Sequence, residues 1–218
     1  MKQFVVIGLG NFGFTVATRL AQIGHEVLAI DSSEARIDAI KDHVTQAITA
    51  DAKNKETLKD LVSNAADAVV VGLGDSIEAS VLCVLYLKEF GVRRIIAKAS
   101  SDDHGRILES IGTSEVIYPE RNAALRLAEK LNAPTSVIDY IELSPEYSII
   151  DVATPDDFVG KTLKQLQLPK KQGILVIAVR SVLKGGEIQL LPPADYKFEP
   201  DSIMTVIGRY EDLNKLAL

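Results

Sequence analysis

Three glycines near the start of the chain have the spacing of a phosphate-binding loop. Gly8, Gly10 and Gly13 form a GxGxxG pattern directly after the apolar run FVVI. In such a loop the first glycine permits a tight turn, the second lets the backbone approach a pyrophosphate, and the third lets the following helix pack closely. The N–H groups and dipole of that helix favour a negative ligand. The pattern predicts a nucleotide site; the alternative is that these glycines only form the turn.

An acidic residue follows at the distance expected for a ribose-binding position. Asp31 lies 18 residues after Gly13 and ends the predicted strand 26–31. A carboxylate at this position accepts hydrogen bonds from ribose hydroxyls and disfavours a 2′-phosphate, and therefore NADP. Ser32, the next residue, is assigned to the same site, and Ser32 or Ser33 is expected to cap the next helix.

Two loops after later strands extend the predicted site. Asp51, with Ala52 beside it, follows the third predicted strand and would lie near the adenosine end of the ligand. A loop or helix-cap role for Asp51 is an equal alternative. Gly72 belongs to the stretch GLGDS and could form the far wall, although Asp75 or Ser76 could simply cap the next helix.

The fifth and sixth predicted strands end at Lys98 and Glu120. Ligands of open α/β sheets bind outside the carboxyl ends of the strands, so both side chains are candidates for the site. Lysine can meet phosphate charge. A carboxylate beside phosphates needs a bridging cation, so Glu120 is also a candidate for a nucleotide-linked metal such as Mg²⁺. The alternative for both residues is a surface ion pair.

Strand and helix patterns that could position these residues alternate along the first half of the chain. Helices are expected between six short apolar strands, at 3–8, 26–31, 45–51, 66–74, 93–99 and 115–120. This alternation predicts a Rossmann-like, doubly wound parallel sheet in an α/β fold.

The pattern changes after the sixth strand. Residues 120–134 read as a helix ended by Pro134, whose apolar stripe of Ala124, Leu127 and Leu131 must pack on another domain or subunit. Strand-rich residues 135–218 predict a small α+β subdomain, with a turn at Gly185–Gly186. The expected organisation is therefore a nucleotide-binding domain (1–119), a crossover helix (120–134) and a C-terminal subdomain (135–218).

Composition narrows the class of protein. The 218 residues are 47% hydrophobic and carry a net charge of −6 without a basic block, so nucleic acid is not an expected partner. No apolar run approaches the length of a membrane span and no signal peptide is visible, so a soluble cytoplasmic protein is expected. The single cysteine, Cys83, lies in an apolar run and is expected to be a buried thiol.

Catalytic groups are scarce. The three histidines are His25, His43 and His104, and none lies in the C-terminal part. We expect His25 to be structural and His104 to lie at the surface. Because a dehydrogenase needs an acid or base beside its nicotinamide, we expect no enzymatic activity. A ligand site joined to an assembly helix is instead the composition of a sensor.

Four stretches of this sequence resemble those of a known family. They are FVVIGLGNFG with HEVLAID, then GLGDSIEASVLCVLYLKEFGVRRIIAKAS, then VIYPERNAALRLAEKL with YIELSPEYSIIDV, and finally FVGKTLKQLQL, GILVIAVRS and FEPDSIMTVIG. Together they are similar to the cytosolic regulatory subunits of bacterial K⁺ uptake systems of the KtrA/TrkA type. Those subunits are built from RCK domains (regulator of conductance of K⁺).

The resemblance implies an assembly and a set of ligands. It implies a homodimer that builds an octameric ring and docks on a membrane K⁺-translocating subunit of the KtrB/TrkH type, at the inner face of the cell membrane. It implies that ATP, ADP or NAD(H) binds and that the nucleotide changes the shape of the ring, and it makes Mg²⁺ or another cation a candidate to bind with the nucleotide. In some members the C-terminal subdomain also binds cyclic di-AMP.

The resemblance also implies roles for single positions. Many members have Arg where this chain has Asn11, and Asn11 cannot supply charge to a terminal phosphate, which gives ADP or NAD(H) more weight. The predicted binding set is Gly8, Gly10, Asn11, Phe12, Gly13, Asp31, Ser32, Asp51, Ala52, Gly72, Lys98 and Glu120. Two alternatives to a K⁺ uptake regulator remain: an NAD(H)-binding regulator of another cation transporter, and a small NAD-dependent oxidoreductase.

Overall fold

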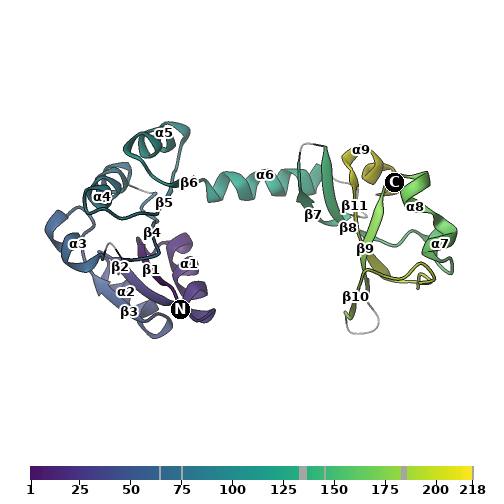
Figure 1. The fold of residues 1–218 in the computed structure, drawn as a ribbon, viewed down its shortest axis with the longest axis horizontal. Helices are drawn as coiled ribbons and strands as arrows, with labels where there is room; N and C mark the ends of the chain where they lie inside the picture. Colours follow the sequence, from purple (N-terminus) through teal and green to yellow (C-terminus); the bar gives the residue numbers. More distant parts are fainter. Residues whose placement is uncertain (64, 75, 133–136, 145, 183–185, 218) are drawn as a thin grey trace. The chain divides into compact units, whose positions relative to one another are not determined.

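The computed structural model describes residues 1–217 apart from 64, 75, 133–136, 145 and 183–185. The described chain divides into two compact units, Met1–Glu120 and Arg121–Leu218 (Figure 1). Each unit has its own sheet and its own apolar core. None of the helices in the described ranges is long and apolar enough to cross a membrane.

The first unit contains a six-stranded parallel sheet in the order β3-β2-β1-β4-β5-β6. Its strands are β1 (Gln3–Ile7), β2 (Glu26–Asp31), β3 (Gln46–Thr49), β4 (Ala68–Val71), β5 (Ile95–Lys98) and β6 (Glu115–Ile117). The chain winds outward from β1 in one direction and returns to wind outward in the other. The predicted doubly wound parallel sheet is therefore confirmed, and its switch point lies between β1 and β4.

Helices cover both faces of this sheet because its strands are apolar on both sides. They are α1 (Asn11–Gln22), α2 (Glu34–Ile40), the 3₁₀ turn η1 (Lys41–His43), α3 (Lys55–Leu61), α4 (Ile77–Glu89) and α5 (Asp102–Ile111). In β1, Val6 packs in the core beneath α1 and α2, whereas Val5 and Ile7 pack in the core beneath α3, α4 and α5. This alternation follows from the period of two along a strand.

Short polar side chains begin the helices that leave the carboxyl edge of the sheet. Asn54, Ser76 and Ser101 accept hydrogen bonds from the backbone N–H groups of Thr57, Ala79 and His104 at the starts of α3, α4 and α5. These caps satisfy N–H groups that have no partner within the helix. Ser33 is the N-cap of α2, but its side chain makes no capping hydrogen bond.

Two buried residues of this unit test the sequence predictions. Cys83 is fully buried on α4, as predicted, and burial raises the pKa of its thiol to about 12. The prediction for His104 was wrong, because its side chain is 1% exposed. Its Nε2 lies 3.1 Å from Ser80 Oγ on α4, and its Nδ1 accepts from Ser100 N–H at 3.3 Å. Burial lowers the pKa of His104.

The end of the first unit also differs from the prediction. We expected the sixth strand to continue through Glu120, but β6 ends at Ile117 and the helix α6 (Pro119–Asn132) begins two residues later. Proline favours the first position of a helix because its φ is preset and no N–H is lost. Glu120 therefore lies in the first turn of α6 and not at a strand end.

The second unit is built on an antiparallel sheet in the order β10-β9-β11-β8-β7. Its strands are β7 (Val137–Glu142), β8 (Tyr147–Ala153), β9 (Leu175–Ser181), β10 (Ile188–Leu190) and β11 (Ser202–Arg209). Its short helices are η2 (Asp156–Phe158), α7 (Leu163–Leu166), α8 (Leu168–Lys171) and α9 (Tyr210–Ala217). The α+β prediction is confirmed. Gly185 of the predicted turn and Pro134 lie outside the described residues.

One face of this second sheet forms the core of the unit. Alternate residues of β8 and β11, such as Val152, Met204 and Val206, are buried with Phe198 and Leu213. The segment between β8 and β9 packs on the same face of the sheet. Within it, Thr162 and Gln165 form a capping box that begins α7, which gives hydrogen-bond partners to backbone N–H groups at the start of this helix.

The helix α6 keeps its apolar residues in solvent. Leu125 and Leu127 are 56% and 57% exposed, and Leu131 is 77% exposed. Ala124, the remaining member of the predicted stripe, is also exposed.

The assignment of the two faces of the second sheet can be tested on neighbouring residues. Met204 is fully buried in β11, whereas Ile203, which points to the other face, is half-buried. We expect Met204→Ala to lower the free energy of unfolding by about 2–5 kcal/mol, because it leaves a cavity. Ile203→Ala is the control and should cost clearly less. Urea unfolding followed by circular dichroism checks this, and equal losses would contradict the assignment.

Candidate nucleotide-binding site

The glycine loop lies where the predicted site requires it, between β1 and α1 at the switch point of the sheet. Gly10 is the N-cap of α1 and Asn11 is its first, exposed residue. The first N–H groups of a helix lack partners within it and, with the helix dipole, favour an anion. Gly8 N–H donates to the Ile30 carbonyl at 2.8 Å and fixes the start of the loop against β2.

Each glycine of the motif has a distinct surrounding. Gly8 has a φ of +90°, which L side chains rarely adopt. A Cβ added to Gly13 would lie 1.9 Å from the Gly8 carbonyl oxygen, so the helix could not approach the strand. A Cβ added to Gly10 would meet no atom within 4 Å. The loop is therefore closed by protein at Gly8 and Gly13 and open at Gly10, which is the arrangement a bound pyrophosphate requires.

A second glycine loop closes against the first. Gly72 N–H donates to the Ile7 carbonyl at 2.7 Å, and a Cβ at Gly72 would lie 2.8 Å from the Gly8 carbonyl oxygen. The predicted far wall is therefore in contact with the glycine loop. Of the two candidates for the cap of α4, Ser76 caps the helix. Asp75 lies outside the described residues.

Asp31 is buried behind the glycine loop and holds it in place. Its Oδ2 accepts from Leu9 N–H at 2.6 Å and its Oδ1 accepts from Ser33 N–H at 2.8 Å. The side chain is 4% exposed, and Arg36 Nη1 lies 3.3 Å from Oδ2. A carboxylate offers about four lone-pair positions, so these donors leave room for a ribose hydroxyl.

Arg36 was missed by the sequence analysis. Its guanidinium is half-exposed on α2 and places positive charge at the predicted ribose end of the site. The sequence could have indicated Arg36 as a site residue, because it lies at the start of the helix that follows Asp31. An arginine near this position accommodates a 2′-phosphate in some dinucleotide sites, so the charge of Asp31 alone does not decide against NADP.

Three further predicted residues follow β2 and β3. Asp51 is exposed, and its Oδ1 accepts from Lys53 N–H at 2.9 Å, so it forms a local turn before α3. Ala52 is buried and Ser32 is exposed. Their role in ligand binding remains a prediction.

Lys98 and Glu120 meet each other. Lys98 Nζ lies 2.6 Å from Glu120 Oε1, with the lysine side chain 13% exposed and the glutamate 70% exposed. The hydrogen bond from Lys98 lowers the pKa of Glu120. The described residues contain no cluster of three or more His, Cys, Asp or Glu side chains suited to a metal. A cation at Glu120 would therefore need oxygen ligands from the nucleotide itself.

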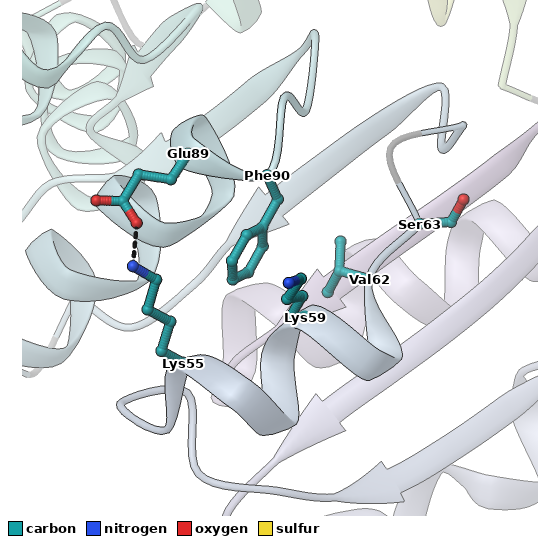
Figure 2. A pocket seen from close by; sticks show the side chains of 6 residues that line it. All are labelled: Lys55, Lys59, Val62, Ser63, Glu89 and Phe90. Carbon is teal, nitrogen blue, oxygen red and sulfur yellow. Dashed lines mark ion pairs between the residues drawn. The ribbon is translucent and has the colours of Figure 1, made fainter.

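A groove of this unit lies away from the glycine loop. It measures about 600 Å³ and is lined by Lys55, Lys59, Val62, Ser63, Glu89 and Phe90. Figure 2 shows Lys55 of α3 directed at Glu89 at the end of α4, where the two side chains form an ion pair. None of the predicted binding residues lines this groove.

Fold and loop together define the first unit as a domain of the Rossmann type. Models of the TrkA-N domain and the TrkA-C domain match residues 4–119 and 147–217. The chain is 35% identical to Ktr system potassium uptake protein C of Bacillus subtilis, over 98% of this chain and 95% of that protein. The chain therefore belongs to the family of Ktr and Trk potassium uptake proteins with TrkA-N and TrkA-C domains.

Solved structures support the fold. The GsuK RCK domain superposes with a TM-score of 0.66 over 99% of this chain at 17% identity, and this chain spans 47% of that one. The GsuK channel bound to NAD superposes with a TM-score of 0.63 over 99% of this chain at 18% identity, and this chain spans 38% of it. The chain thus covers half or less of the length of these structures. At such identity the likeness concerns the fold.

The contrast between Gly13 and Gly10 gives a stability prediction. We expect Gly13→Ala to lower the free energy of unfolding by about 3 kcal/mol, because the new methyl group overlaps a backbone carbonyl. Gly10→Ala should cost no more than about 1 kcal/mol, the preference for glycine over alanine at an N-cap. Urea unfolding of both variants checks this, and a cost for Gly10→Ala as large as that for Gly13→Ala would refute the open face at Gly10.

Proposed function

We propose that this chain is the nucleotide-sensing regulatory subunit of a K⁺ uptake system of the Ktr or Trk type. The observation that carries the proposal is the glycine cradle that is open only at Gly10, in a chain whose near full-length relative is a Ktr potassium uptake protein. Ligand binding in the first unit would control K⁺ flux through a membrane partner.

The proposed ligand is ATP, ADP or NAD(H). The N–H groups at the start of α1 would donate to phosphate oxygens at the open face of Gly10, and Asp31 would accept from ribose hydroxyls. Asn11 is neutral and adds no charge for a terminal phosphate, which favours ADP or NAD(H) over ATP. A related fold, the GsuK channel, has been solved with NAD. Mg²⁺ with the nucleotide and cyclic di-AMP in the second unit remain proposals.

The proposed assembly is a homodimer that builds an octameric ring, docked on a membrane K⁺-translocating subunit at the inner face of the cell membrane. The exposed leucines of α6 support an assembly of copies of this chain, because apolar residues at helical spacing are rarely left in water. We assign residues 120–134 as the crossover helix between the two parts of the chain.

A regulatory role needs no catalytic acid or base, and the position of His104 agrees with such a role. His104, the last histidine of the chain, is buried between α4 and α5, where it binds Ser80 and Ser100. The alternatives remain an NAD(H)-binding regulator of another cation transporter and a small NAD-dependent oxidoreductase. Detectable hydride transfer would favour the latter.

Nucleotide binding is tested with a thermal-shift panel of ATP, ADP, AMP, NAD, NADH, NADPH and cyclic di-AMP, with and without Mg²⁺. A ligand that binds only the folded protein raises the melting temperature. We expect ADP, ATP or NAD(H) to do so, and Gly10→Ala to weaken their binding at least tenfold, because its methyl group fills the phosphate position.

Gly10→Ala is preferred to an Asp31 variant because Asp31 also holds Leu9 and Ser33. Circular dichroism of Gly10→Ala serves as the folding control. If none of the ATP, ADP and NAD(H) ligands stabilises the wild type, or if Gly10→Ala binds them as well as the wild type does, the proposed site is wrong.

Assembly is tested on α6. We expect Leu127→Glu to lower the mass of the assembly measured by light scattering, because a charge would be buried where a neighbouring chain covers the helix. Asn122→Glu adds the same charge at another exposed position of α6 and serves as the matched control. An unchanged mass for Leu127→Glu would show that the leucine stripe is not part of an interface.

A further inference from the structure

Lys98 is not a freely moving surface lysine. It ends β5, and its side chain packs on the second glycine loop: a Cβ added to Gly74 would lie 3.0, 3.1 and 3.3 Å from its Cε, Cδ and Cγ. The side chain is 13% exposed. Packing thus fixes the direction of the methylene groups of Lys98. Its ammonium group can still exchange one anionic partner for another.

Its present partner, Glu120, is a side chain exposed to water. The ammonium group pairs with Glu120, which is 70% exposed in the first turn of α6. Ion pairs that face water contribute little, because water screens the charges and ordering two long side chains is costly. A stronger anion placed near Lys98 would therefore displace Glu120.

The site proposed for the nucleotide lies within reach of such an exchange. Gly74, on which Lys98 packs, belongs to the same loop as Gly72, and Gly72 contacts Gly8. The strands β1, β4 and β5 are neighbours, so the ends of β1 and β5 are about 10 Å apart at two strand spacings. A phosphate chain that starts on Gly10 and crosses β4 would approach the ammonium group of Lys98.

We propose that Lys98 exchanges Glu120 for a phosphate of the bound nucleotide and so releases the first turn of α6. The proposal rests on the proposed function and names the residue that links the ligand to this helix. Released Glu120 faces the anion without a counter-charge, so it turns away from the site. The exchange requires a diphosphate or a longer phosphate chain; AMP, with one phosphate, binds the glycine loop without reaching Lys98.

The first test compares ligand affinities by calorimetry for ADP and AMP. In Glu120→Gln the competitor of the ligand is neutral, so we expect ADP to bind about twofold to fivefold more tightly than to the wild type and AMP to bind unchanged. Lys98→Gln should weaken ADP and leave AMP unchanged. Glu115→Gln, which removes another exposed carboxylate that pairs with Arg94 at the other end of β5 and β6, should bind ADP as the wild type does.

The second test measures the mobility of the start of α6. A spin label on Asn122→Cys reports the mobility of the first turns of α6, because Asn122 is exposed and the native Cys83 is fully buried. ADP should raise the mobility of the label in the wild-type background, and AMP should not. In the Lys98→Gln background the mobility should already be high and should not respond to ADP.

The outcomes separate the two proposals. If none of ATP, ADP and NAD(H) binds the wild type, the nucleotide site falls and the exchange falls with it. If ATP or NAD(H) binds but ADP does not, the nucleotide site stands and the exchange is overturned. If ADP binds but Glu120→Gln leaves its affinity unchanged, or the label does not respond, the nucleotide site stands and the exchange is overturned.

Discussion

The first unit depends on the close approach of three backbone segments at the Gly8 carbonyl oxygen. A side-chain carbon at Gly13 would lie 1.9 Å from this oxygen, and one at Gly72 would lie 2.8 Å from it. The first contact sets the distance between α1 and β1, and the second sets the distance between the loops after β1 and β4. Because β1 and β4 form the centre of the sheet, both halves of the domain meet at this oxygen. Substitution of these glycines therefore affects the fold before it affects any ligand.

Asp31 connects this backbone contact to the ribose end of the site. Its carboxylate is buried, and it accepts hydrogen bonds from the backbone of the glycine loop and of the turn before α2. A buried carboxylate is tolerated because its charge is hydrogen-bonded and lies beside Arg36. The group proposed to accept from the nucleotide is thus also the group that shapes the loop, so the loop is organised before a ligand arrives.

Sequence reasoning reached the parts of the structure that depend on local pattern. The period of the apolar residues and the glycine spacing were enough to predict a doubly wound parallel sheet and the place of the loop. Sequence reasoning failed where the burial or the secondary structure of a single residue depends on its particular neighbours. His104 has a polar sequence surrounding, but it is buried because Ser80 of α4 and Ser100 supply partners for its ring. Glu120 was placed on a strand, because the preference of Pro119 for a helix start was not weighed against the apolar run before it.

The connection from the site to α6 follows from the position of that helix start. Because β6 ends early, Pro119 and Glu120 begin α6 beside the carboxyl edge of the sheet, where ligands of such folds bind. Tyr118, the last residue before α6, lies over Gly105 of α5, where a methyl group would overlap its hydroxyl. Packing thus fixes the helix start through Tyr118, and an ion pair with Lys98 ties Glu120 to the edge of the sheet. A helix start that is attached in part by an ion pair responds to charge, and charge is what a nucleotide phosphate brings to this edge.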